Sequence, residues 1–358
     1  MQKIELISID KAYEVGNPII ENLNLNIDDG SFTVLLGPSG CGKSTILRMI
    51  AGLEKETGGE IFIGGKTMQN VEPGDRDIAM VFQNYALYPT MTVRGNIEFG
   101  LENNKIPKDE RNTRIHEICD MIGITEYLNR KPQSLSGGQR QRVALARAMV
   151  KKPSVFLMDE PLSNLDAKLR SQIRTELIEL YHNLKTTFVY VTHDQVEAMS
   201  MGTHIILLNK GEIMQQGSPI EIYNNPQNIF TAQFIGTPPM NILKMSDINN
   251  FKRVDDDVAY VGFRPEHVQI APKNLSNMFA GSVLRLTGKI VTHEVLGSEI
   301  LYKVETPSGV ILLKIFDLSQ IFEGEISVVI PEKNLCYFDH NENRIIPREI
   351  ADGKQLCI

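Results

Sequence analysis

The stretch SFTVLLGPSGCGKSTILRMIAGL, residues 31–53, decides the fold of this chain. Residues 31–37 predict a buried strand that runs into a glycine-rich turn, and residues 43–53 predict a helix that ends near Gly52. The turn GPSGCGKS, residues 37–44, fits the pattern G-x-x-x-x-G-K-[ST], in which backbone N–H groups cradle phosphates at the start of a helix. The stretch therefore predicts a nucleotide-binding α/β domain.

The residue types in this turn predict how a nucleotide is held. The Lys43 ammonium neutralises the outer phosphates, the Ser44 hydroxyl holds Mg²⁺, and Thr45 lies close by. We expect ATP as the nucleotide, in contact with Gly37, Pro38, Ser39, Gly40, Cys41, Gly42, Lys43, Ser44 and Thr45.

A second apolar strand, VFLMDE at residues 155–160, ends in two adjacent carboxylates. Such a pair, taken alone, is equally well explained as a solvated strand end. Beside a phosphate loop, a division of labour is the better interpretation: Asp159 serves the metal, and Glu160 acts as the general base on the attacking water.

Strands and helices alternate along residues 1–235, which predicts a parallel sheet covered by helices. Ligands of such sheets bind at the carboxyl ends of the strands, and Gln83, Asp159, Glu160 and His193 all lie at such ends. Gln83 and His193 are individually weak signals, since a lone glutamine or histidine is usually structural. The expected strands are 3–9, 58–65, 77–83, 187–194 and a hairpin over 204–217, and the expected helices are 108–128 and 167–184.

The stretch LSGGQRQRVALARAMV, residues 135–150, predicts a helix whose first turn contains residues that disfavour helix formation. Gly137 and Gly138 each destabilise a helix by roughly 1 kcal/mol relative to alanine. Glycine lets a bare backbone approach another group closely, and a helix N-terminus favours an anion. An ordinary N-capped helix after a loop is the alternative.

The sequence changes character near residue 236. Short strands and turns follow, which predicts a small all-β domain at 236–358, most simply a barrel, after an ATPase domain at 1–235. The first part holds 24 Lys and Arg against 28 Asp and Glu, and the second 13 against 16, for a total net charge of -7. Neither part is basic, so we expect no binding to nucleic acid.

The composition is typical of a globular protein, with 42% hydrophobic and 23% charged residues. The four cysteines form no CxxC pair or metal-binding spacing, which favours a reducing, cytosolic setting. The start MQKIELISID shows no signal peptide, and no apolar run approaches the roughly 20 residues that span a bilayer.

Five motifs in order, over about 230 residues, resemble the nucleotide-binding subunits of ABC transporters: GPSGCGKST, Gln83, LSGGQ, VFLMDEPLSNLD and VTHD. The resemblance implies a P-loop cassette with a parallel core sheet, an antiparallel β subdomain and a helical subdomain at about 88–150. It also implies that the signature residues face the γ-phosphate of an ATP held by a second subunit. The implied contacts are Ser136, Gly137, Gly138 and Gln139 with that phosphate, Tyr13 with adenine, Gln83 with Mg²⁺ and water, Asp166 with the dimer interface, and His193 with the γ-phosphate.

Three further segments, 76–89, 217–241 and 262–268, resemble the ATPase subunits of bacterial carbohydrate importers of the maltose, multiple-sugar and glycerol-3-phosphate type. Ser31 and Thr90 depart from that pattern, the second in the stretch that meets the permease. The resemblance implies an OB-like C-terminal domain with dimerising and regulatory roles. NYALYP, residues 84–89, is either ordinary core or a groove for a helix of the membrane subunit.

These observations predict an ATPase subunit that powers solute import, most simply of a sugar or sugar derivative. The expected partners are a second copy or close paralogue, two transmembrane permease subunits, indirectly an extracytoplasmic solute-binding protein, and a regulator at the C-terminal domain. The expected location is the cytoplasmic face of the bacterial membrane. Alternatives are a polyamine or ion importer, a soluble ABC ATPase outside transport, and a nucleotide-sensing regulator.

Overall fold

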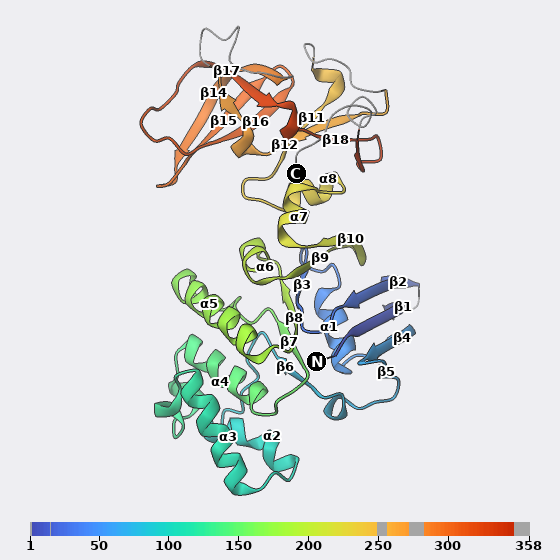
Figure 1. Ribbon diagram of the computed structural model, residues 1–358, viewed down its shortest axis with the longest axis vertical. Coiled ribbons are helices and arrows are strands. Elements are labelled where there is room, and N and C mark those ends of the chain that lie inside the picture. The colour runs from blue at the N-terminus through green and yellow to red at the C-terminus, as the bar shows by residue number, and fades with distance from the viewer. Residues whose placement is uncertain (1, 15, 249–255, 272–282, 347–358) are drawn as a thin grey trace. The chain divides into compact units, whose positions relative to one another are not determined.

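The structure is a computed structural model that describes residues 2–14, 16–248, 256–271 and 283–346. Its contacts divide the chain into two compact units, Met1–Ile220 and Glu221–Ile358 (Figure 1). The domain boundary near residue 236 stays a prediction from the sequence.

The first unit is built on a six-stranded sheet in the order β10-β9-β3-β8-β7-β6. Its strands run parallel except for the edge strand β10, which is antiparallel to β9. Every residue of β3, β7 and β8 is buried, as expected for parallel strands covered on both faces. The bounds are β3 (Phe32–Leu36), β6 (Ile78–Val81), β7 (Val155–Asp159), β8 (Thr187–Thr192), β9 (His204–Asn209) and β10 (Glu212–Gly217).

A second, antiparallel sheet in the order β2-β1-β4-β5 covers helix α1 (Lys43–Ala51). One apolar cluster joins Ile4 and Leu6 of β1, Ile46 and Ile50 of α1, and Leu35 of β3. Figure 1 shows α1 between this sheet and the parallel sheet. The sandwich fixes α1, and with it the loop before the helix. The bounds are β1 (Ile4–Glu14), β2 (Asn17–Ile27), β4 (Gly58–Ile63) and β5 (Lys66–Thr67).

Helices α5 (Ala167–Leu184) and α6 (Gln195–Met201) lie across the parallel sheet from α1, and α2 (Val93–Asn103), α3 (Lys108–Met121) and α4 (Gly137–Met149) form the helical part of the unit (Figure 1). The predicted helix over 108–128 is too long, since α3 ends at Met121. Gly123 adopts a left-handed φ of 65°, and a single 3₁₀ turn, Thr125–Tyr127, follows. The left-handed glycine stops the helix.

The second unit contains α7 (Pro219–Asn224), α8 (Ile229–Phe234) and two antiparallel sheets, ordered β11-β12-β18-β19 and β13-β17-β14-β15-β16. The long strand β14 pairs with β17 through residues 283–289 and with β15 through residues 289–295, so the five-stranded sheet curls along it. This curled sheet confirms the predicted OB-like domain. The bounds are β11 (Asn241–Lys244), β12 (Tyr260–Phe263), β13 (Gln269–Ile270), β14 (Val283–Val295), β15 (Ile300–Thr306), β16 (Gly309–Ile315), β17 (Glu325–Pro331), β18 (Cys336–Phe338) and β19 (Arg344–Ile345).

Arg264 ties the two short helices of this unit to its sheets. The side chain is 2% exposed, and its guanidinium donates to the carbonyls of Tyr223 at 2.8 Å, Ala232 at 3.1 Å and Ile235. It also lies 4.1 Å from the centre of the Tyr223 ring. The importer-like segments 217–241 and 262–268 therefore meet at one buried cation, whose two terminal nitrogens donate to carbonyl oxygens.

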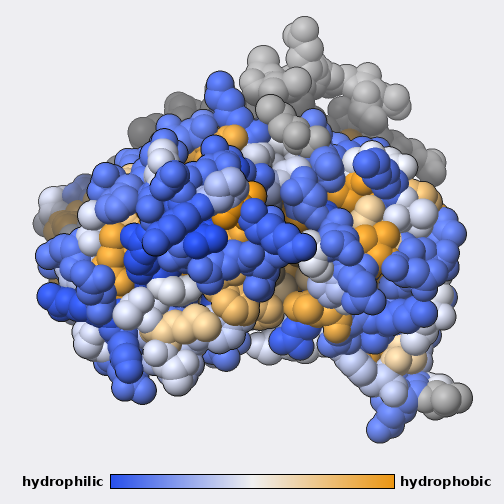
Figure 2. Space-filling view, turned by 90° about the horizontal axis from the view of Figure 1, so that it is seen from below, coloured by the Kyte–Doolittle hydropathy of each residue, from blue (hydrophilic) through white to orange (hydrophobic). Residues whose placement is uncertain are grey.

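Among the residues that the structure describes, no helix combines the length and the apolar character that crossing a membrane requires. The face in Figure 2 is mostly hydrophilic, and its apolar residues gather in separate patches.

Candidate active site

The loop between β3 and α1 has a shape that only glycine permits at two places. A Cβ on Gly37 would lie 2.2 Å from the carbonyl oxygen of Leu208. Gly42, at the start of α1, has a φ of 101°, which side chains rarely allow. The loop therefore keeps its backbone close to β9 and turns directly into the helix.

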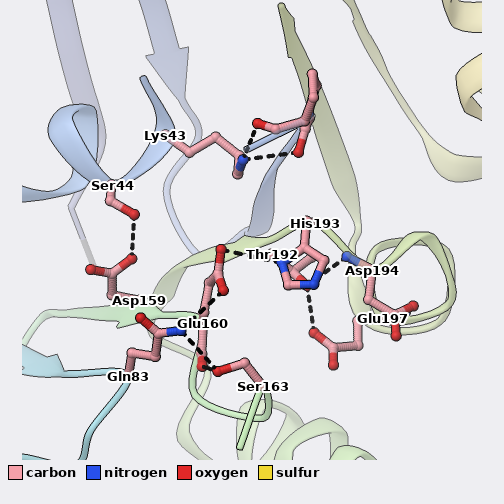
Figure 3. Close-up of polar contacts among 12 residues, drawn as sticks. Lys43, Ser44, Gln83, Asp159, Glu160, Ser163, Thr192, His193, Asp194 and Glu197 are labelled. Atoms are coloured by element: carbon pink, nitrogen blue, oxygen red, sulfur yellow. Dashed lines mark hydrogen bonds and ion pairs between the residues drawn. The ribbon is translucent and has the colours of Figure 1, made fainter. Parts of the chain in front are cut away.

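Lys43 lies at the centre of this loop and is only 5% exposed. Its ammonium donates to the carbonyl oxygens of Gly37 at 2.9 Å and Pro38 at 2.8 Å (Figure 3). A lysine has three donors and a single positive charge, so the same group can turn from these carbonyls to phosphate oxygens without leaving the loop.

Ser44 and Asp159 face each other between α1 and the end of β7. The Ser44 hydroxyl donates to Asp159 Oδ1 at 2.6 Å, and Arg48 Nη2 lies 3.7 Å from Asp159 Oδ2. A hydroxyl and a carboxylate are hard oxygen ligands of the kind that Mg²⁺ takes in phosphate-binding sites. This donor pair fits the metal that the sequence predicts.

Glu160 is the centre of the second cluster (Figure 3). Gln83 Nε2 lies 3.4 Å from Glu160 Oε2 and 3.2 Å from Ser163 Oγ, and His193 Nδ1 lies 3.3 Å from Glu160 Oε1. Gln83, Glu160 and His193 follow β6, β7 and β8, which are neighbours in the sheet. The structure thus brings these three predicted residues together, whereas the Gln83 amide is directed to Glu160 rather than to Ser44 and Asp159.

The backbone of Glu160 is strained, with a left-handed φ of 43°. Non-glycine residues in this region cost on the order of 1–3 kcal/mol and occur where the surrounding structure enforces them. Here the Glu160 N–H donates to Val191 O at 3.1 Å, and Ser163 Oγ donates to Glu160 O at 2.9 Å. These bonds aim the carboxylate at the cluster.

A small cavity of about 40 Å³ opens beside the Glu160–His193 pair. It has room for a water molecule within reach of the carboxylate. Arg170, Asp194 and Glu197 also line it, and none of the three was predicted as a site residue from the sequence. Glu197 lies four residues after His193 in the first turn of α6, a spacing that places it near the histidine.

Glu197 is 3% exposed and accepts hydrogen bonds from Tyr190 at 2.8 Å and Thr192 at 2.7 Å. Burial raises the pKa of the Glu197 carboxyl, and the two hydrogen bonds only partly offset that effect. Thr192 directly precedes His193, so the buried carboxyl anchors the strand end that carries the histidine.

Tyr13, the predicted adenine contact, lies on β1 and is 56% exposed. Its hydroxyl donates to Glu54 Oε2 at 2.6 Å, and Lys11 Nζ lies 4.7 Å from the ring centre. The tether fixes the edge of the ring and leaves part of its surface open to a stacking partner.

The signature helix α4 begins with a capping box. The Gln139 N–H donates to Ser136 Oγ at 3.3 Å, and the Ser136 N–H donates to Gln139 Oε1 at 2.8 Å. The structure adds a reason for the glycines beyond close approach to a phosphate. A Cβ on Gly138 would lie 2.9–3.3 Å from three atoms of Leu169 in α5, whose first turn is capped by Asp166.

Gly138→Ala is therefore expected to destabilise the chain, although alanine favours helix by about 1 kcal/mol over glycine. Overpacking against Leu169 costs about 1–3 kcal/mol, which outweighs that gain. In a Leu169→Ala background the same substitution should instead stabilise. Urea unfolding of the four chains measures this change of sign.

Gly137→Ala is the matched control, because its Cβ would meet only one terminal methyl of Leu165, at 3.2 Å. We expect a smaller effect there. Stabilisation by Gly138→Ala in the otherwise unchanged chain would contradict the packing argument.

Together the fold and the site define the class: a P-loop ATPase with a parallel core sheet, an antiparallel β layer and a helical part that carries a second glycine-rich helix start. Residues 20–163 match the ABC transporter family, and residues 261–325 match the TOBE domain family. The chain belongs to the ABC transporter family and is an ATP-binding ATPase subunit.

Similar proteins and solved structures support this assignment. The chain is 46% identical, over 96% of its length and 100% of the relative's, to "sn-glycerol-3-phosphate import ATP-binding protein UgpC 3" of Agrobacterium fabrum. It is 54% identical, over 75% of its length and 79% of the relative's, to a UgpC protein of the same description from Bartonella bacilliformis. The structure described as a dimeric post-hydrolysis state of the ATP-binding cassette MJ0796 bound to ADP and Pi has a TM-score of 0.55 and 35% identity, covering 60% of this chain and 98% of that one.

Proposed function

We propose that this chain hydrolyses ATP to power import of sn-glycerol-3-phosphate, or a closely related sugar derivative, through a transmembrane permease. The observation that supports this most is its 46% identity across the full length of the Agrobacterium fabrum import protein. Two copies, or one copy and a close paralogue, bind two ATP molecules head to tail at the cytoplasmic face of the bacterial membrane.

In this proposal each ATP lies between two chains. Lys43 and the loop amides of one chain bind the phosphates, and Tyr13 stacks on the adenine. Ser136, Gly137 and Gly138 of the other chain offer a hydroxyl, N–H groups and the positive end of the α4 dipole to the γ-phosphate. Asp166 lies at the interface, next to the packing of Leu169 on Gly138.

Ser44, Asp159 and Gln83 would hold Mg²⁺, which would neutralise charge on the phosphates. Glu160 accepts the proton of the attacking water, and His193 orients Glu160 and contacts the γ-phosphate. The proposed base and its orienting histidine already lie 3.3 Å apart. Closure of the dimer around ATP then drives the permease, and hydrolysis lets the dimer open again.

An extracytoplasmic solute-binding protein delivers the solute to the permease, and a regulatory protein acts on the C-terminal domain. NYALYP, residues 84–89, supports contact with the permease, because Tyr88 is 41% exposed in an apolar stretch that directly follows Gln83.

Uptake assays test the solute. In the organism that carries the gene, deletion should abolish uptake of labelled sn-glycerol-3-phosphate and leave uptake of maltose and spermidine unchanged. The wild-type chain should restore uptake, and a chain with Glu160→Gln should not. Loss of maltose or spermidine uptake with retained sn-glycerol-3-phosphate uptake would contradict the proposed solute.

A further inference from the structure

The segment from Gln83 to Tyr88 is fixed at three places within six residues. At its start the Gln83 side chain contacts Glu160 at 3.4 Å. At its end the backbone of Tyr88 bonds to the fully buried Asn96 of α2, with the N–H donating to Asn96 Oδ1 at 2.7 Å and the carbonyl accepting from Asn96 Nδ2 at 3.1 Å. The middle of the segment is held by a different element.

Tyr85 and Ala86, in that middle, are consecutive non-glycine residues with left-handed backbones, at φ 64° and 45°. L-amino acids rarely adopt this conformation, because Cβ then crowds the following carbonyl. Two such residues in a row persist only where other groups enforce them.

Arg147 supplies the enforcing contacts. Its Nη2 donates to Tyr85 O at 2.8 Å and its Nη1 donates to Ala86 O at 2.6 Å, so one guanidinium is bonded to both residues. The same group lies 6.0 Å from the centre of the Tyr88 ring. Burial lowers the pKa of Arg147, and the two carbonyls offset part of the desolvation of the charge.

The position of Arg147 in the chain connects these two hydrogen bonds to the signature residues. It lies in the last turn of α4, the helix that Ser136 caps at its N-terminus. A rigid helix thus joins the signature residues to the segment that carries Gln83. Arg147 reaches the two carbonyls through two separate nitrogens of its planar guanidinium. Lysine has a single nitrogen, so it does not reproduce this geometry.

We propose that Arg147 is a positioning residue: by holding Tyr85 and Ala86 left-handed, it makes Gln83 follow the signature helix α4. This inference rests on the proposed function, in which α4 meets the ATP of the partner chain. When α4 moves to meet that ATP, Arg147 carries the segment with it, and Gln83 keeps the position beside Glu160 that hydrolysis requires.

Steady-state kinetics of the full-length chain test the proposal. Arg147→Met and Arg147→Lys should each lower kcat by about tenfold, because a misplaced group near the reacting atoms slows turnover. The KM for ATP should stay within about twofold, since Arg147 does not touch the nucleotide. Arg142→Met is the matched control: Arg142 is also in α4 and bonds Ile122 O and Glu176, and it makes neither contact of Arg147.

Rescue separates positioning from simple loss of stability. Ala86→Gly lowers the cost of the left-handed backbone, so it should restore much of the kcat of Arg147→Lys. The proposal is overturned if Arg147→Met keeps wild-type kcat, or if Arg142→Met loses as much and Ala86→Gly restores nothing.

A spectroscopic readout follows the segment directly. The chain contains no tryptophan, so Tyr88→Trp introduces a single tryptophan, which can be excited selectively at long wavelength, beside Phe99, whose ring centre lies 5.0 Å from that of Tyr88. ATP should shift its emission when Arg147 is present, and the shift should vanish with Arg147→Met while ATP still binds. An unchanged shift in that variant overturns the proposal. These readouts use the isolated chain, so an error in the proposed solute would not affect them.

Discussion

Glu160→Gln should lower the rate of ATP hydrolysis by about 10²–10⁴-fold, the contribution of a positioned general base. The amide has nearly the shape of the carboxylate and cannot take up a proton at neutral pH. It can still contact Gln83 and His193, which lie 3.4 Å and 3.3 Å from the carboxylate oxygens. Phosphate release at saturating ATP measures the loss.

The same variant should bind ATP normally, because Lys43 and Ser44 are untouched. ATP should therefore hold two copies together for longer, which size-exclusion chromatography with ATP and Mg²⁺ detects. Glu176→Gln serves as the control, since that carboxylate pairs with Arg142 at 2.6 Å, outside the cluster around Glu160. Turnover near the wild-type rate would show that another group is the base.

The part of the fold that follows from local pattern was predictable. Helix α5 matches its predicted range, 167–184, because its apolar spacing is regular and Asp166 caps it, accepting from Leu169 N at 2.9 Å. Helix α3 ends seven residues before its predicted limit, because the apolar pattern continues past the left-handed Gly123 into a 3₁₀ turn. Strand β2 was missed, although residues 23–27 alternate apolar and polar side chains and Asp28, Asp29 and Gly30 follow them as turn residues.

The cluster of Gln83, Glu160 and His193 was predictable for a topological reason. Each residue follows a strand of a parallel sheet, and the carboxyl ends of such strands share one edge. The contacts of Arg147 had no such signal, and those of Glu197 had only its spacing of four residues from His193. They join side chains to groups 62 and 7 residues away through tertiary packing, and neither periodicity nor a motif encodes that pairing.

The signature glycines have a second explanation that the sequence alone does not reveal. The sequence suggested that Gly137 and Gly138 leave space for a phosphate. The structure shows that a Cβ on Gly138 would press against the two methyl groups of Leu169 in its own chain, at 2.9 and 3.0 Å. The two reasons are compatible, and an experiment on two chains separates the phosphate contact from the packing.

Mixing two inactive variants is expected to restore ATP hydrolysis, if each site combines Lys43 of one chain with Ser136 of the other. Lys43→Met keeps the length of the side chain and removes its charge. Ser136→Asp keeps a good N-cap for α4 and places a negative charge opposite the γ-phosphate. Each variant alone should lose about 10²-fold or more in activity, the effect of removing one transition-state contact.

In a mixed dimer of these variants both substitutions fall in the same site, and the other site is intact. With random pairing, half of the dimers are mixed and each has one working site, so an equal mixture should recover about 25% of wild-type activity. A chain carrying both substitutions is the control, because mixing it with the Lys43→Met chain leaves no intact site. The two variants could form mixed dimers and still be as inactive as each variant alone. That result would rule out two independent sites that each combine residues of both chains. Full activity of the Ser136→Asp variant by itself would contradict the proposed contact between Ser136 and the γ-phosphate more directly. The added carboxylate would then not lie opposite a phosphate.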